Sequence, residues 1–418
     1  MAYQHAQLTQ EDVPPDVWKV ARPEAPAPLR GMVAKGLAPL PPASLVLALY
    51  AFWAAGDGDH GEQAARTVEG LPPNILNGAL DDKALHPGVL DFLARKHARN
   101  VELLERIIRH PRVDDETLAS IARLCPESIC DMLSENQQRW MKFPPIVEAL
   151  YQNPNCRMSV AQRMLELAVR EGIDVKLPNM EEIRTALQLD DSPVDEARDA
   201  VFKGAAGRAL ASHDEAVERA QRAGADEAFD PLAPDATEDP DDGELAGLDA
   251  LLQHGLGDDM SLPMEDDEEA EEEKAPPPPV QEETKDRVTL ISKLRTMEKI
   301  RMALLGNAFE RAVLIRDSNK SVCMSAIKSP RVKENEVVAY SQNRSLPHEV
   351  VRYIAGRREW TKLYTVKLNL VLNPKTPLSQ AMGLLGHLHA HDVRKVARSK
   401  NIASALATAA KRRADKRR

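Results

Sequence analysis

The chain has 418 residues, of which 43% are hydrophobic and only 4% aromatic, and its net charge is −10. This length predicts two hydrophobic cores rather than one. The shortage of aromatic residues beside abundant Ala, Leu and Val argues against a sheet-rich sandwich or barrel, and the four cysteines include no C-x-x-C pair that would indicate a disulfide framework or a zinc finger. We therefore predict an all-α fold.

The first 43 residues are rich in proline and alanine. Because proline cannot continue a helix, we expect residues 1–43 to form a partly ordered arm. The most apolar stretch, residues 44–55, is shorter than the roughly 20 residues of a membrane span, so it predicts a buried helix. The N-terminus shows neither the basic nor the apolar region of a secretion signal, which favours a cytoplasmic protein.

Residues 44–212 form the predicted N-terminal lobe. Prolines break the helical spacing of its apolar residues at intervals of about 14 to 28 residues, each of which suits one helix with a turn or a short helix pair. After Pro111, for example, Asp114 is a suitable N-cap, and Leu118 and Ile121 follow on one helix face. The pattern indicates a series of short helices.

Residues 213–284 separate the lobes and carry 3 Lys or Arg against 25 Asp or Glu, a net charge of −22. Like charges repel and the apolar content is low, so we predict a disordered, extended linker. One stretch, residues 245–256, differs, because Leu245, Leu248, Leu251, Leu252 and Leu256 make an amphipathic helical pattern flanked by acidic residues. It is either a transient helix without a role or a docking motif that folds on a partner or on the basic lobe of the same chain.

Residues 285–418 carry 29 Lys or Arg against 10 Asp or Glu, a net charge of +19. They comprise the predicted C-terminal lobe, 285–413, and a basic tail, 414–418. Because the acidic linker is joined directly to this lobe, we hypothesise that it screens the basic surface from weak competitors. Apolar spacing predicts helices at 288–304, 308–316, 319–328, 334–342, 347–356, 360–372, 377–388, 391–398 and 401–412.

Part of the N-terminal lobe recurs in the C-terminal lobe. Residues 110–118 match residues 329–337, with Pro-Arg-Val in both, and Asn153-Pro154 matches Asn373-Pro374. The two prolines of each copy stand 43 residues apart in the first and 44 in the second. A repeated helical unit punctuated by proline is typical of stacked-helix arrays, which present surfaces to partners. Downstream, Ser159, Ala161 and Leu165 match Ser379, Ala381 and Leu385.

The stretches 316–322 and 326–332 resemble HEAT-like repeats and the related leucine-rich-repeat variants, in which an acidic residue and an Asn or Pro precede a short Val-bearing helix. Residues 373–401 resemble the ending of a family of uncharacterised bacterial helical-repeat proteins. The resemblance covers most of residues 44–180 and 288–412. It implies two α-solenoid lobes that act in scaffolding and binding, sometimes of nucleic acid, and it brings no catalytic residue that could be transferred to this chain.

No nucleotide-binding, hydrolase or metalloprotease motif occurs in the sequence, so we predict a protein that is not an enzyme and has no cofactor. His387, His389 and His391 are the first place to look for a metal. On a helix, however, only the first and the last of them share a face. We therefore predict solvated histidines at a helix end and no metal site.

The C-terminal lobe contains a candidate surface for a polyanion or an acidic partner. Cations of this kind bind phosphates through charge and counterion release, and the interleaved Tyr353, Trp360 and Tyr364 could stack on unpaired bases. On a simpler interpretation, Trp360 and Tyr364 are core residues and the cations form a solvated face. The candidate cations are Arg352, Arg357, Arg358, Lys362, Lys367, Arg394, Lys395, Arg398 and Lys400.

These observations together predict a non-enzymatic interaction scaffold of two HEAT-like lobes joined by a long acidic linker, whose basic C-terminal lobe takes an acidic protein partner. The alternative is a nucleic-acid-associated protein that binds phosphates through the same cations. We expect neither membrane binding nor a small-molecule substrate.

Overall fold

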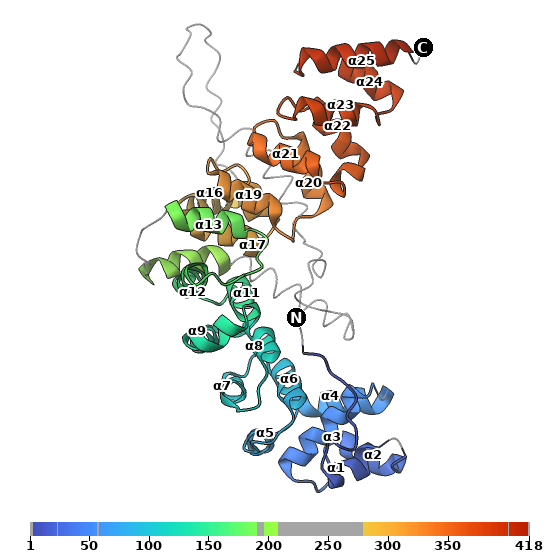
Figure 1. The fold of residues 1–418 in the computed structure, drawn as a ribbon, viewed down its shortest axis with the longest axis vertical. Coiled ribbons are helices and arrows are strands. Elements are labelled where there is room, and N and C mark those ends of the chain that lie inside the picture. The colour runs from blue at the N-terminus through green and yellow to red at the C-terminus, as the bar shows by residue number, and fades with distance from the viewer. Residues whose placement is uncertain are drawn as a thin grey trace. The chain divides into compact units, whose positions relative to one another are not determined.

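The computed structural model describes residues 3–22, 24–56, 58–189, 196–207, 279–399 and 401–416. Their regular secondary structure is entirely helical, as the composition predicts (Figure 1). The chain forms two compact units, unit 1 up to residue 177 and unit 2 beyond it; of the described residues after 177, only Glu196, in the 3₁₀ turn η1 (Glu196–Arg198), belongs to unit 1. The predicted linker, 213–284, lies outside the described residues except for 279–284.

Unit 1 is built from short helices that pack both on their neighbours and on the helix two places further along. One series of contacts runs α3, α5, α7, α9 and α12, and a second runs α4, α6, α8 and α11. The helices are α1 (Pro15–Ala21), α2 (Ala27–Ala34), α3 (Pro42–Ala54), α4 (Gly58–Glu69), α5 (Pro73–Leu80), α6 (Pro87–Lys96), α7 (Val101–Arg109), α8 (Asp115–Ala122), α9 (Glu127–Glu135), α10 (Gln137–Lys142), α11 (Pro145–Gln152) and α12 (Met158–Arg170).

The proline-rich N-terminal residues contain two helices, α1 and α2, which pack on α3. Pro15 and Pro28 stand in the first turn of these helices, where the backbone N–H groups have no intrahelical partner and proline costs nothing. The prolines therefore start helices here instead of preventing them, and this stretch is part of the fold of unit 1. The apolar stretch that follows is a buried helix, as predicted, with every residue from Leu45 to Phe52 buried in α3.

A buried carboxylate ties the first residues of the chain to the core of unit 1. Asp91 on α6 is fully buried, and its Oδ2 lies 3.0 Å from His5 Nε2 and 2.5 Å from Arg95 Nε. His5 Nδ1 in turn lies 3.1 Å from the Tyr50 hydroxyl on α3. Burial alone would raise the pKa of Asp91, but the hydrogen bonds from His5 and Arg95 hold the pKa below its ordinary value.

Polar residues at the C-termini of some helices connect them to carbonyl groups at the end of an earlier helix. In unit 1, His110 follows α7, and its Nε2 lies 3.1 Å from the carbonyl oxygen of Asp82. Asn153 follows α11, and its amide Nδ2 donates to the carbonyl oxygens of Ala122 at 2.8 Å and Cys125 at 3.0 Å. The other side-chain atom of each residue accepts the backbone N–H two positions later.

Unit 2 uses the same device at the matching place in its sequence. Asn373 follows its helix, its Nδ2 donates to the carbonyl oxygens of Ser341 and Asn343 at 3.1 Å each, and its Oδ1 accepts the N–H of Lys375 at 3.0 Å. Asn153 and Asn373, which the sequence repeat aligns, therefore do the same structural work. Each donates to carbonyl groups at helix ends, which have no partner within their own helix.

Unit 2 also packs its helices on the next but one, as in the contacts of α17 with α19, α19 with α21, α20 with α22 and α22 with α24. Its helices are α13 (Met180–Leu189), α16 (Pro279–Ser292), α17 (Thr296–Leu305), α18 (Ala308–Leu314), α19 (Lys320–Lys328), α20 (Glu334–Gln342), α21 (His348–Gly356), α22 (Tyr364–Leu372), α23 (Leu378–Leu385), α24 (Ala390–Arg398) and α25 (Ser404–Lys416), with the 3₁₀ turn η2 (Trp360–Lys362) before α22.

Several boundaries differ from the predicted ones, for example the end of the predicted linker, since α16 begins at Pro279, and the predicted helix 360–372, which divides into η2 and α22. Helix α13, expected in the N-terminal lobe, packs on α17 and α19, and Glu182 pairs with Lys328 at 2.8 Å. The predicted helix 288–304 is interrupted between α16 and α17, because the N–H of Arg295 is capped by Glu298 at 2.7 Å. A buried ion pair joins α18 to α20, with Arg311 2.7 Å from Glu336.

Replacing Asn153 or Asn373 with Ala should destabilise the unit that contains it. The substitution leaves two buried carbonyl groups and one N–H without their side-chain partner, at a cost of about 1–3 kcal/mol. Urea unfolding followed by circular dichroism measures the change. Asn74→Ala, at an exposed position in α5, is the matched control and should shift the unfolding midpoint little; an equal shift in all three variants would contradict the proposed role of the two asparagines.

Replacing Asp91 with Asn should remove a stabilising interaction that requires the ionised carboxylate and therefore depends on pH. The folded-state pKa of Asp91 lies below its unfolded value of about 3.9, so its contribution is complete above that value and is lost as the pH falls through the folded-state pKa. The Asn variant should therefore be less stable than the native protein by about 2 kcal/mol at neutral pH, and the difference should shrink in strong acid. Thermal unfolding across pH measures it, with the exposed Asp174→Asn as control.

Candidate functional site

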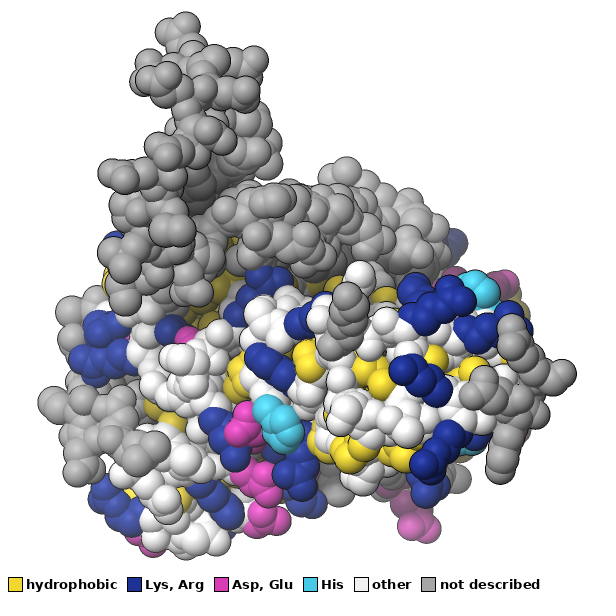
Figure 2. All heavy atoms as spheres, turned by 90° about the horizontal axis from the view of Figure 1, so that it is seen from above, with side chains coloured by type: hydrophobic (Ala, Val, Ile, Leu, Met, Phe, Trp, Pro, Cys, Tyr) yellow, Lys and Arg dark blue, Asp and Glu magenta, His cyan; other side chains and the backbone are white. Residues whose placement is uncertain are grey.

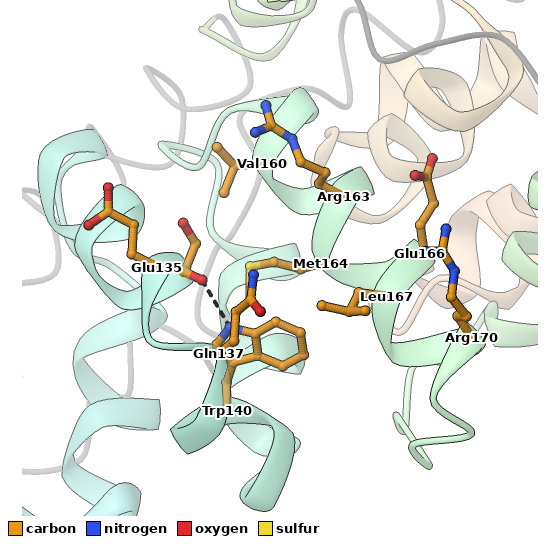
Figure 3. A pocket seen from close by; sticks show the side chains of 10 residues that line it. Glu135, Gln137, Trp140, Val160, Arg163, Met164, Glu166, Leu167 and Arg170 are labelled. Carbon is orange, nitrogen blue, oxygen red and sulfur yellow. Dashed lines mark hydrogen bonds between the residues drawn. The ribbon is translucent and has the colours of Figure 1, made fainter.

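Unit 1 contains a pocket between α9, α10 and α12 with a volume of about 300 Å³. Trp140, Met164 and Leu167 lie together at its apolar centre, and charged side chains of α12 stand at its edge (Figure 3). The Trp140 indole N–H donates to the carbonyl oxygen of Ser134 at 3.0 Å, which fixes the ring. Ser134 supplies a hydroxyl to the lining, and it donates to the backbone carbonyl oxygen of Asp131.

The candidate cations of unit 2 lie on α21, in the turn that follows it, and on η2, α22 and α24. These elements contact one another, since η2 packs on both α21 and α22, and α22 packs on α24. Lys367 is half-buried on α22, and Lys400 lies outside the described residues. The exposed members of the set are Arg352, Arg357, Arg358, Lys362, Arg394, Lys395 and Arg398.

The candidate cations have no acidic partner among the described residues. Among the described residues, no Asp or Glu forms an ion pair with any of the eight placed members of the set, although the pairing of cations is common in unit 1. There Lys96 pairs with Glu69, and Arg106 pairs with Asp81. Figure 2 shows Lys and Arg side chains over much of the visible face, with Asp and Glu in a few places. The candidate cations therefore keep their charge available.

The interleaved aromatic residues are partly engaged by the protein itself. The guanidinium of Arg357 lies 4.9 Å from the centre of the Tyr353 ring, and its Nε donates to the Tyr353 hydroxyl at 3.1 Å. Trp360 packs edge-on against Tyr353 with the ring centres 5.9 Å apart. Both rings are half-buried, so each keeps part of its surface exposed.

Tyr364 has a structural task, because it joins α22 to α24. Its hydroxyl donates to Asp392 and accepts the backbone N–H of His389 at 3.1 Å. The hydrogen bond from Tyr364 is the main reason that the pKa of Asp392 lies below its ordinary value. The position of this tyrosine therefore fits the simpler interpretation, in which it is a packing residue. Its hydroxyl stabilises the start of the helix that carries Arg394, Lys395 and Arg398.

The three candidate histidines have different surroundings. His387 follows α23, His389 is the N-cap of α24 with its ring 4.4 Å from that of Tyr364, and His391 lies 3.6 Å from the neighbouring Asp392. In the part of the chain that the structure describes, no three His, Cys, Asp or Glu side chains gather at a common point where a metal ion would fit.

Sequence reasoning missed two apolar side chains beside the basic surface. Leu378 and Met382, four residues apart on α23, are 44% and 43% exposed. A signal for them exists in the sequence, since residues 378–385 include no charged side chain although the helix lies in a strongly basic region.

Comparison with known proteins finds no counterpart: no family model matches the chain, and no curated protein or solved structure is significantly similar to it. Among the described helices, none combines the length and the apolar character needed to cross a membrane.

Replacing Tyr364 with Phe should weaken the attachment of α24 to α22 without substituting any of the candidate cations. The variant loses two hydrogen bonds at the start of that helix, worth about 1 kcal/mol each. Hydrogen exchange of α24 amides should become faster, whereas exchange in α20 should stay the same. Unchanged exchange in α24 would show that the tyrosine does not hold this helix.

Proposed function

We propose that the protein is a non-enzymatic interaction scaffold built from two HEAT-like α-solenoid units, and that unit 2 binds an acidic segment of a partner protein through its exposed cations. The cytoplasmic, bacterial setting expected from the sequence belongs to the same proposal. The observation that carries it is the set of Arg and Lys side chains on α21, η2, α22 and α24 that lack an acidic partner among the described residues.

The packing of the helices supports the solenoid part of the proposal. In both units, helices contact the next but one, and side chains at helix ends bind carbonyl groups about 30 residues earlier, as Asn153 and Asn373 do. In stacked-helix repeats each unit contacts only its neighbours, so the residues on the outer surface take no part in the packing and are available for binding.

Charge supports the choice of an acidic partner. Residues 344–418 contain 17 Lys or Arg and 4 Asp or Glu, a net charge of +13. An unpaired exposed cation gains an attraction from an incoming carboxylate without first breaking an internal ion pair. In unit 1, Arg106 would have to give up its contact with Asp81, at 2.5 Å, to do the same.

A nucleic acid would use the same cations, and the overall charge favours that alternative. The aromatic residues favour it less, because a base-stacking site needs open ring faces. Tyr364 is hydrogen-bonded between two helices, and the face of Tyr353 carries Arg357. We therefore favour an acidic protein segment, and an oligonucleotide is the competing outcome of the test.

The test measures fluorescence anisotropy of a labelled poly-glutamate peptide against the full chain, at low and at physiological ionic strength. Binding should weaken as salt rises, since the attraction is between exposed charges. The triple variant Arg357→Gln, Arg358→Gln, Lys362→Gln should bind about tenfold more weakly at low salt, because each exposed pair contributes up to about 1 kcal/mol. Labelled single-stranded and duplex oligonucleotides are measured in parallel.

The matched control neutralises three exposed cations of unit 1, with Arg66→Gln, Lys83→Gln and Arg109→Gln. It removes the same net charge from the chain, so it separates an effect of overall charge from an effect of the proposed surface. Equal losses in both triple variants would contradict the proposal. Binding of oligonucleotides with none of poly-glutamate would replace it with the nucleic-acid alternative.

A further inference from the structure

Helix α23 presents an apolar strip that its own fold does not cover. Ala381 and Leu385 face inward and pack in a core with Val393 and Leu406. Leu378 and Met382 lie beside them on the same helix, yet 44% and 43% of their surface is exposed. Two large apolar side chains at positions i and i+4 make a continuous strip, which fits the apolar face of a second helix.

The neighbours of α23 supply positive charge. The C-terminal end of α21 reaches another flank of α23, since a Cβ at Gly356 would stand 4.0 Å from Gln380 Nε2, and the exposed Arg357 and Arg358 follow directly. Helix α25 packs on α23, where Arg413 donates to the carbonyl oxygen of Gly386 at 2.6 Å. Lys411 and Arg412 of the same helix are exposed. An uncharged strip between basic neighbours fits an amphipathic helix with acidic residues around its apolar face.

The chain contains a segment with this chemistry. Residues 244–259 lie outside the described residues, but their sequence places Leu245, Leu248 and Leu252 at helical spacing. The same segment includes Glu244, Asp249, Asp258 and Asp259 and has no Lys or Arg. It therefore offers both an apolar strip and the opposite charge.

The connection is long enough for the segment to reach α23. Between Leu256 and the start of α16 there are 22 residues, which span up to about 70 Å when extended. Helix α16 packs on α18, in the first helix pair of unit 2. The path from α18 to α23 passes through α19 and α21, which makes three steps between neighbouring helices. At about 10 Å a step the distance is about 30 Å, which is less than the reach of the connection.

We propose that residues 244–259 bind to α23 as an amphipathic helix within the same molecule, with Leu248 and Leu252 on Leu378 and Met382. This inference rests on the proposed function, because the bound segment places its carboxylates on the cations that recruit the acidic partner. The segment is thus an internal competitor. Its tether gives it an effective concentration of the order of millimolar, so only a partner that binds more tightly displaces it.

The test places a photoreactive benzoylphenylalanine at position 382 of the full chain and identifies the crosslinked peptide by mass spectrometry. The expected product joins position 382 to residues 244–259 in the monomer. A second variant carries the same crosslinker at position 378 instead. It should give the same product, which shows that the result does not depend on the substitution at position 382. Products elsewhere in the chain, or products only in a crosslinked dimer, would overturn the proposal.

A second measurement tests the competition itself. Leu248→Ser with Leu252→Ser in the full chain should raise the affinity for labelled poly-glutamate severalfold, because the internal competitor is lost. Leu232→Ser with Leu262→Ser changes two leucines of the same region outside the segment and should leave the affinity as it is. If both double variants behave alike, the segment does not compete.

The two proposals fail in different ways. If poly-glutamate binds no variant but the crosslink to residues 244–259 forms, the acidic-partner function fails and the internal contact stands. If poly-glutamate binds and depends on Arg357, Arg358 and Lys362 but no crosslink forms, the surface stands and the internal competitor fails.

Discussion

The structure depends on satisfying the carbonyl groups at the ends of many short helices. The last four carbonyl groups of a helix have no partner within it, and helices of 7 to 13 residues, such as α1 and α3, place a large share of their backbone at such ends. His110, Asn153 and Asn373 provide donors from a later helix end, and Arg413 does the same for Gly386. These bonds fix which helix lies beside which, so the core positions and the outer surface follow from them.

Local rules of helix initiation and termination explain how much of the fold the sequence predicts. The predicted helices 319–328, 334–342 and 347–356 agree with α19, α20 and α21 to within a residue at each end, because caps such as Asn319 act within one turn. Proline, by contrast, has two meanings. It ends a helix after residue 110 but begins one at Pro15, and only the packing of α1 on α3 decides between them.

Interactions between distant residues explain what the sequence leaves open. Helix α13 pairs Glu182 with Lys328, 146 positions later, and no local pattern identifies that partner. The same limit applies to the candidate site. Charge density along the chain identifies Arg352 and Arg394 as well as Lys328, yet only the fold distinguishes a cation with an acidic partner from one without. For Tyr364, likewise, spacing cannot show that its hydroxyl is used between α22 and α24.

The two matched segments show how one architecture supports different surfaces. Helix α12 follows Asn153-Pro154 and α23 follows Asn373-Pro374, so they occupy equivalent places in their units. Around α12, Arg157 pairs with Asp131 of α9 at 2.8 Å and Arg163 pairs with Glu196 at 2.9 Å. Helix α23 has no charged residue, and among the residues that the structure describes the cations near it have no such partners. In both segments the inward-facing residues form the core and the asparagines cap the helix ends. The residues at outer positions are not needed for this packing and can therefore differ. A helix with an exposed Leu and Met and no charge is poorly suited to contact with water alone. The difference between α12 and α23 is therefore better explained by a contact that α23 makes than by any need of the fold.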